Sequence, residues 1–117
     1  MNNRSKGAHG ERIAIKYLSD KGYELLDMNY WVKFGEVDLI MLHGEFIVFV
    51  EVKMRWDCDK GWPVEAVTPK KQKNIRQVAN IYWQMGQWKN KQPRFDVIEI
   101  IKYEQNKTAI RHIVNAF

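Results

Sequence analysis

The sequence predicts an α/β domain in which a mixed sheet of about five strands is flanked by helices. The order of the apolar patterns along the chain is helix, three strands, helix, two strands. Residues that commonly cap helices stand where each of the two helical patterns begins or ends. With 117 residues, 45% of them hydrophobic, the chain has the size of one domain, so we expect a single domain over residues 1–117.

Two segments have helical periodicity. The first covers about residues 5–21 and is followed by Gly22, which suits a C-terminal cap. The second covers about residues 69–86, with proline at its first position and Thr68 before it as the expected N-cap.

Five segments have the composition and periodicity of strands. They are residues 23–28, 36–42, 46–53, 95–102 and 109–114. The second and third flank residues 43–45 and therefore predict a hairpin. A two-residue loop at positions 43 and 44 would pair Leu42 with Glu45.

The hairpin carries acids inside apolar strands, and such acids need an explanation. In the expected register Glu36 lies opposite Glu51, Asp38 lies diagonal to it, and both share a face with Lys53. Three acids beside one lysine favour a bound cation. Mg²⁺ or Mn²⁺ would suit Asp38 and Glu51 as ligands, with Lys53 orienting water or offsetting phosphate charge. The alternative is a solvated edge hairpin with Glu51 and Lys53 as a surface pair.

Charge and composition limit the classes of function. The net charge is +5, and from the end of the third strand to residue 76 there are seven basic residues against three acids: Lys53, Arg55, Lys60, Lys70, Lys71, Lys73 and Arg76. This segment is either a polyanion site or a solvated loop and helix face. A single cysteine, Cys58, excludes an internal disulfide, and the three histidines lack the spacing of a zinc site. No apolar run approaches the roughly 20 residues of a membrane span, so we expect a soluble, cytoplasmic protein.

Asp38 followed by Glu51-Val52-Lys53 at the end of an apolar strand resembles the PD-(D/E)XK nuclease superfamily. Over about residues 7–114 the chain also resembles the YraN-like family of small bacterial proteins. That resemblance rests on Gly10-Glu11, Gly22-Tyr23, Asn29, Gly35-Glu36-Val37-Asp38-Leu39-Ile40, Val48-Phe49-Val50-Glu51-Val52-Lys53, Arg55, Val67, Lys71 and Arg94-Phe95-Asp96-Val97.

The resemblance implies a restriction-endonuclease-like fold, which archaeal Holliday junction resolvases share, and hydrolysis of DNA. It implies that Asp38 and Glu51 bind a metal ion together with the carbonyl of Val52, and that Lys53 is the catalytic lysine. In two respects this chain differs from the patterns it resembles. Val37 replaces the proline of the superfamily's name, and Trp31 stands where many family members carry arginine.

The resemblance also implies roles for residues on the helices. Glu11 corresponds to an acid that completes the site, and Lys71 to a basic residue that holds a phosphate. Basic residues at a helix start oppose its dipole, and a phosphate-facing role would explain them. We therefore expect nucleic-acid contacts from Arg55, Lys70 and Lys73, although a solvated face is the alternative for the last two. Glu36 is expected beside the metal ligands rather than on the metal.

The first hypothesis is a Mg²⁺- or Mn²⁺-dependent endonuclease that acts on DNA, with a branch, flap or single strand as a plausible substrate. The second is a nucleic-acid-binding module that keeps the fold without catalysis. RNA is an alternative substrate, and the sequence does not distinguish a monomer from a homodimer. Trp56 and Trp62 either stack on an unpaired base or anchor the loop that follows the third strand. Arg94 and Asp96 are expected to form a structural ion pair at the edge of the sheet.

Overall fold

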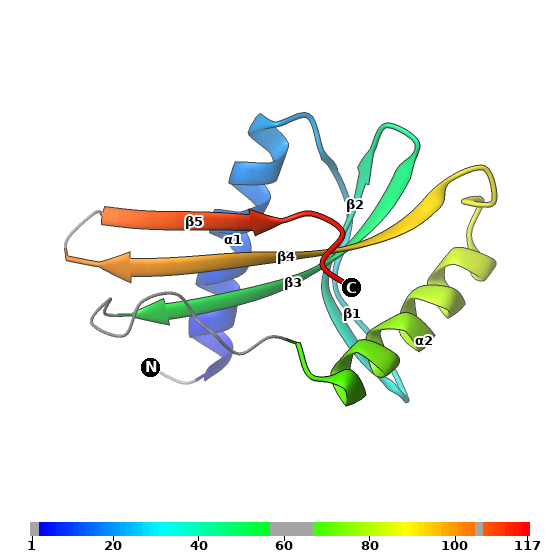
Figure 1. Ribbon diagram of the computed structural model, residues 1–117, viewed down its shortest axis with the longest axis horizontal. Helices are drawn as coiled ribbons and strands as arrows, with labels where there is room; N and C mark the ends of the chain where they lie inside the picture. Colours follow the sequence, from blue (N-terminus) through cyan, green and yellow to red (C-terminus); the bar gives the residue numbers. More distant parts are fainter. Residues whose placement is uncertain (1–2, 57–66, 105–106) are drawn as a thin grey trace.

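A computed structural model describes residues 3–56, 67–104 and 107–117. In these ranges one five-stranded mixed sheet has the order β1-β2-β3-β4-β5, with a helix on each face (Figure 1). The elements are α1 (Asn3–Asp20), β1 (Glu24–Val32), β2 (Gly35–His43), β3 (Phe46–Trp56), α2 (Pro69–Met85), β4 (Gln92–Tyr103) and β5 (Lys107–Ile113). The predicted element order and the predicted α/β class are confirmed.

The connections explain why the sheet is mixed. β1, β2 and β3 form an antiparallel meander, and β5 is antiparallel to β4. β3 and β4 are parallel, so the chain must return to the starting end of the sheet between them. The segment that makes this return contains α2.

The described core lies in two clusters because side chains alternate along the central strands. Ile47 and Phe49 of β3 pack toward α2, while Val48 and Val50 pack toward α1. Both faces of β3 are therefore buried, as expected for a strand with a parallel neighbour. Within the described ranges, neither helix is long and apolar enough to cross a membrane.

The predicted helix caps are confirmed. Gly22 has a φ of +90°, and the amide of Tyr23 donates to the carbonyl of Leu18, which closes the end of α1. At the start of α2, the hydroxyl of Thr68 accepts a hydrogen bond from the amide of Lys71 at 3.2 Å.

The first strand is longer than the prediction of residues 23–28. β1 continues to Val32, which pairs with Gly35 across a two-residue turn. Two irregularities hid this continuation from the sequence pattern. The register shifts between Leu25 and Asp27, and Asn29 has a φ of +52°, so the simple alternation of side chains is interrupted.

The predicted register of the β2–β3 hairpin is wrong by two residues. Leu42 pairs with Ile47 instead of Glu45, and the turn lies at Gly44-Glu45. The physical reason is the φ of +59° at Gly44, a conformation that two-residue hairpin turns need and glycine adopts without strain. Because the error is an even number of residues, it leaves the faces of the paired residues as predicted. Before that ladder the alternation is interrupted at Asp38, since Val37 packs in the cluster toward α2 and Leu39 in the cluster toward α1, so the predicted common face of Glu36 and Asp38 does not follow.

A buried polar cluster joins β4 to the last strand. The Asp96 carboxylate is fully buried and accepts from Arg94 Nε at 2.9 Å, Arg94 Nη2 at 2.8 Å and the amide of Asn115 at 3.0 Å. His112 Nε2 lies 2.7 Å from its Oδ2, and Arg94 also donates to the hydroxyl of Tyr23 at 2.7 Å. The predicted Arg94–Asp96 ion pair therefore exists, but on an interior strand, not at the edge.

We predict that Asp96→Asn destabilises the protein by about 3 kcal/mol at pH 7, because Arg94 loses its buried counter-charge. Burial acts to raise the pKa of Asp96, but hydrogen bonds from His112, Arg94 and Asn115 outweigh it and lower the pKa. A lowered folded-state pKa gives stability that is present above the unfolded value and is lost as pH falls through the folded value. The difference in unfolding free energy between wild type and Asp96→Asn should therefore become smaller below about pH 3.8.

Urea unfolding at pH 7 and pH 3 measures this difference. Glu104→Gln is the control, because Glu104 forms an exposed ion pair with Lys107 and should change stability by less than about 0.5 kcal/mol. Equal destabilisation by the two variants would contradict the prediction.

Candidate active site

The candidate site begins where β2 and β3 stop pairing. Counted from the hairpin turn, the last pair of their ladder is Leu39 with Val50. Asp38 and Glu51 are the next residues beyond this pair, one on each strand. The amide of Val52 donates to Asp38 Oδ2 at 2.8 Å. This bond holds the Asp38 carboxylate against β3, beside Glu51.

Glu51 is a buried carboxylate with only half of its hydrogen bonding satisfied. Its side chain is 6% exposed, and Oε1 lies 2.7 Å from the ammonium of Lys71 on α2. Oε2 is buried and has no hydrogen-bond partner among the described residues. A buried oxygen left unpaired costs about 1–3 kcal/mol, and more when it is charged, so this position favours a positive ligand.

The surroundings of Asp38 oppose the ionisation of its carboxyl group. Burial, and after it the negative charge of Glu51, raises the pKa of Asp38 to about 8. The hydrogen bond from the amide of Val52 acts in the opposite direction but does not compensate. Without a further positive charge nearby, Asp38 therefore stays mostly protonated over much of the neutral range.

Glu11 on α1 belongs to the same electrostatic neighbourhood. It is buried and accepts a hydrogen bond from Asn29 Nδ2 at 3.0 Å. Burial raises the pKa of Glu11, the Asn29 bond partly offsets this, and the charges of Glu36 and Glu51 raise it further. Asn29 is thus the contact through which the irregular part of β1 positions an acid of the first helix.

Lys71 supplies positive charge from α2. Burial alone would lower the pKa of Lys71, but its hydrogen bond to Glu51 and the charges of Glu51 and Asp38 raise it. Its ammonium therefore stays charged at neutral pH. The side chain is about half exposed and can reach a ligand in the space beside it.

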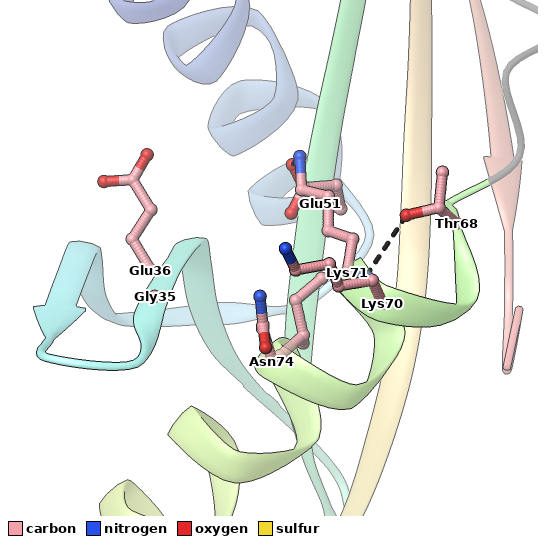
Figure 2. A pocket seen from close by; sticks show the side chains of 8 residues that line it. Gly35, Glu36, Glu51, Thr68, Lys70, Lys71 and Asn74 are labelled. Carbon is pink, nitrogen blue, oxygen red and sulfur yellow. Dashed lines mark hydrogen bonds and ion pairs between the residues drawn. The ribbon is translucent and has the colours of Figure 1, made fainter.

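A pocket of about 340 Å³ opens between the start of β2, Glu51 of β3 and the first turns of α2 (Figure 2). Its lining residues are Gly35, Glu36, Glu51, Thr68, Lys70, Lys71, Asn74 and Ile75. Figure 2 shows Glu36 on the β2 side and the two lysines on the helix side. The pocket therefore places cationic side chains next to the Glu51 carboxylate.

Lys53 continues the same face of β3 two residues after Glu51, and it is half-buried. In the parallel register it lies beside Glu99 of β4. Glu99 is 3% exposed, and its Oε1 lies 2.7 Å from Arg111 Nη2 on β5 and 2.8 Å from Nε. Glu99 was not predicted as a site residue, although it has the same signal as Asp38 and Glu51, an acid inside an apolar strand. No feature of the sequence indicated Arg111.

The structure brings most predicted site residues together, but not all. Glu36 and Lys70 line the pocket, whereas Lys73 lines a different groove on the far side of α2. Arg55 lies farther along β3. Trp56 is 46% exposed and stacks on His9. Three residues considered in the sequence lie outside the described residues: Cys58, Lys60 and Trp62.

In the described ranges no group of three or more His, Cys, Asp or Glu side chains is arranged to hold a metal ion. The donor set nevertheless fits Mg²⁺, which commonly takes one or two carboxylates and completes its shell with water and phosphate oxygens. Asp38 and Glu51 provide two carboxylates, and Oε2 of Glu51 provides an oxygen that no described residue hydrogen-bonds.

The α1–β1–β2–β3–α2–β4–β5 order, with paired acids where β2 and β3 separate, is consistent with a restriction-endonuclease-like fold. The chain belongs to the uncharacterised protein family UPF0102, whose sequence model matches residues 10–100. The resemblance to the YraN-like family is thereby confirmed. The matched span includes Glu11, Asp38, Glu51, Lys53 and Lys71.

Relatives named UPF0102 protein occur in several bacteria. The chain is 44% identical to one from Caldanaerobacter subterraneus, over 100% of this chain and 98% of the relative. It is also 44% identical to one from Clostridioides difficile, over the full length of both. A protein from Rhodococcus opacus is 41% identical over 98% of each chain.

We predict that Asp38→Asn stabilises the metal-free protein more at pH 9 than at pH 5. The folded-state pKa of Asp38 is raised above its ordinary value of 3.8, so the folded state binds more protons than the unfolded state up to about pH 8. Wild-type stability therefore falls as pH rises through this window, and the asparagine variant does not share that fall.

Thermal unfolding in EDTA at pH 5, 7 and 9 measures the effect. Asp20→Asn is a matched control, because Asp20 forms an exposed ion pair with Lys16 on α1. An Asp38→Asn difference that stays constant from pH 5 to pH 9 would contradict the placement of two mutually repelling acids.

Proposed function

We propose that the protein is a nuclease that hydrolyses phosphodiester bonds in DNA with the help of Mg²⁺ or Mn²⁺. One observation supports this most strongly. Asp38 and Glu51 lie side by side at the end of the β2–β3 ladder, and Glu51 keeps a buried oxygen that has no partner among the described residues. A purely structural site would pair that oxygen, whereas a metal-dependent hydrolase needs it.

The chemistry divides between the cation and the protein. When bound, a divalent cation would activate a water molecule and stabilise the charge that develops on the phosphate. Asp38 and Glu51 would hold the cation together with the carbonyl of Val52. The amide of the same residue already orients Asp38.

Lys71 and Lys53 would act on the phosphate. Lys71 pairs with Oε1 of Glu51 at 2.7 Å, which leaves Oε2 for a cation, and its half-exposed ammonium would contact a phosphate in the pocket. Lys53 would offset the charge that grows on the phosphate in the transition state. Glu11 would complete the site through water, as the family resemblance implies.

The pocket suits contact with the nucleic-acid backbone. Lys70 and Lys71 line it, and the chain carries a net charge of +5. Such contacts position a substrate without reading its sequence. RNA as an alternative substrate, a cytoplasmic location and a homodimer remain predictions from the sequence.

We predict metal-dependent cleavage that Asp38→Ala and Lys53→Ala each reduce by at least about 100-fold, because each variant removes charge stabilisation at the reacting phosphate. The assay uses single-stranded, duplex, flap and four-way-junction DNA and a single-stranded RNA, with Mg²⁺, Mn²⁺ or EDTA. Lys16→Ala is the matched lysine control, because Lys16 is 80% exposed on α1 and pairs only with Asp20 among the contacts described for it.

Cleavage by Lys16→Ala at the wild-type rate, with loss in the two site variants, would support the proposal. Binding without cleavage of every substrate in either metal would contradict it. That result would favour a nucleic-acid-binding module that has kept the fold.

A further inference from the structure

The tip of the β1–β2 hairpin exposes two aromatic rings. Trp31 is 72% exposed and Phe34 is 54% exposed, while most other aromatic side chains in the described ranges are buried or half-buried. Lys33 lies between them in the turn and is also exposed. Exposed aromatic surface of this kind commonly marks a binding site.

The register directs Trp31 toward the site. Trp31 pairs directly with Glu36, and side chains of directly opposed residues leave a sheet on the same face. Glu36 and Gly35 line the pocket that contains Glu51 and Lys71, and Figure 2 shows them on its hairpin side. The exposed tryptophan therefore shares a face of the hairpin with Glu36, which lines that pocket.

The hairpin is held firmly on its other face. Tyr30 packs edge-on against Tyr82 of α2 with ring centroids 4.9 Å apart, and Val32 packs against the same core cluster. Gly35 lies close enough to α2 that an added Cβ would be 3.5 Å from that of Asn74. Because the backbone is anchored in this way, a ligand that stacks on the tip orders little additional chain.

We propose that Trp31 and Phe34 form a base-stacking surface on the hairpin that lines the pocket, so that the substrate presents unpaired bases there. A single strand, a flap or a junction offers free base faces, whereas in a continuous duplex these faces are already stacked on each other. The lysines of the pocket and Lys33 suit the phosphates of the same strand. This inference rests on the proposed function, because it names the substrate of the same site.

Trp56 is a weaker candidate for this role. Its ring stacks on His9 with centroids 5.9 Å apart, and the Lys102 ammonium lies 5.6 Å from the ring centroid. The Trp56 ring therefore already has partners within the protein.

The test separates base stacking from charge. Binding is measured by fluorescence anisotropy in EDTA, so that no cleavage occurs, with a labelled oligothymidine and an oligonucleotide of equal length and charge in which abasic residues replace the nucleosides. We expect wild type to bind oligothymidine at least about 5-fold more tightly than the abasic oligonucleotide. The double variant Trp31→Ala/Phe34→Ala should lose this preference while keeping its affinity for the abasic strand.

Two further variants make the comparison specific. Trp31→Phe should retain most of the preference, because another aromatic ring can stack. Met85→Ala should retain all of it, because Met85 is an equally exposed apolar residue, 79% exposed, at the other end of α2.

A double variant with the wild-type preference would overturn the inference. If that variant also sediments as a monomer where wild type sediments as a dimer, the hairpin tip is instead an interface between copies of the chain. If a preference is lost in the double variant but wild type cleaves nothing, the stacking surface stands and the nuclease proposal fails. If wild type cleaves DNA but shows no preference for oligothymidine over the abasic strand, the nuclease proposal stands and the stacking surface fails.

Discussion

The central constraint in this structure is the close approach of two carboxylates, the buried Glu51 and the half-buried Asp38, at the point where β2 and β3 separate. Asp38 and Glu51 are held beside each other by strand pairing and by the amide of Val52, and neither can move far without breaking the sheet. Burial, and after it the charge of Glu51, raises the pKa of Asp38, and Lys71 neutralises one oxygen of Glu51 from α2. The hydrophobic clusters on both faces of β3 supply the stability that tolerates this unfavourable arrangement.

A second buried acid in the same sheet shows what a satisfied carboxylate looks like. Asp96 accepts hydrogen bonds from Arg94 and Asn115 and contacts His112, and its pKa is lowered. Glu51, by contrast, leaves one buried oxygen unpaired among the described residues. Because both acids lie on buried central strands, burial alone does not explain the difference. It is better explained by function, since Asp96 fastens the C-terminal strand while the Asp38–Glu51 pair is incomplete without a positive ligand.

The faces of β3 were predictable from the sequence because its side chains alternate between the two core clusters. The shared face of Glu51 and Lys53 therefore survives a register error of two residues at Gly44, whereas the break in alternation at Asp38 of β2 was not predictable. The length of β1 was not predictable, because the positive φ of Asn29 and the shift before Asp27 interrupt the pattern. Lys71 and Lys73 are close in sequence, yet helical geometry directs them to different grooves.

The most direct measurement is the anomalous scattering of Mn²⁺ in crystals of the protein soaked in that ion. We expect a peak bonded to one carboxylate oxygen of Asp38 and to Oε2 of Glu51, the oxygen that has no partner among the described residues. The variant Asp38→Asn should lose the peak in the same crystal form. A Glu51 carboxylate still paired with Lys71 and without a peak at saturating Mn²⁺ would contradict the claim that this acid pair is a metal site.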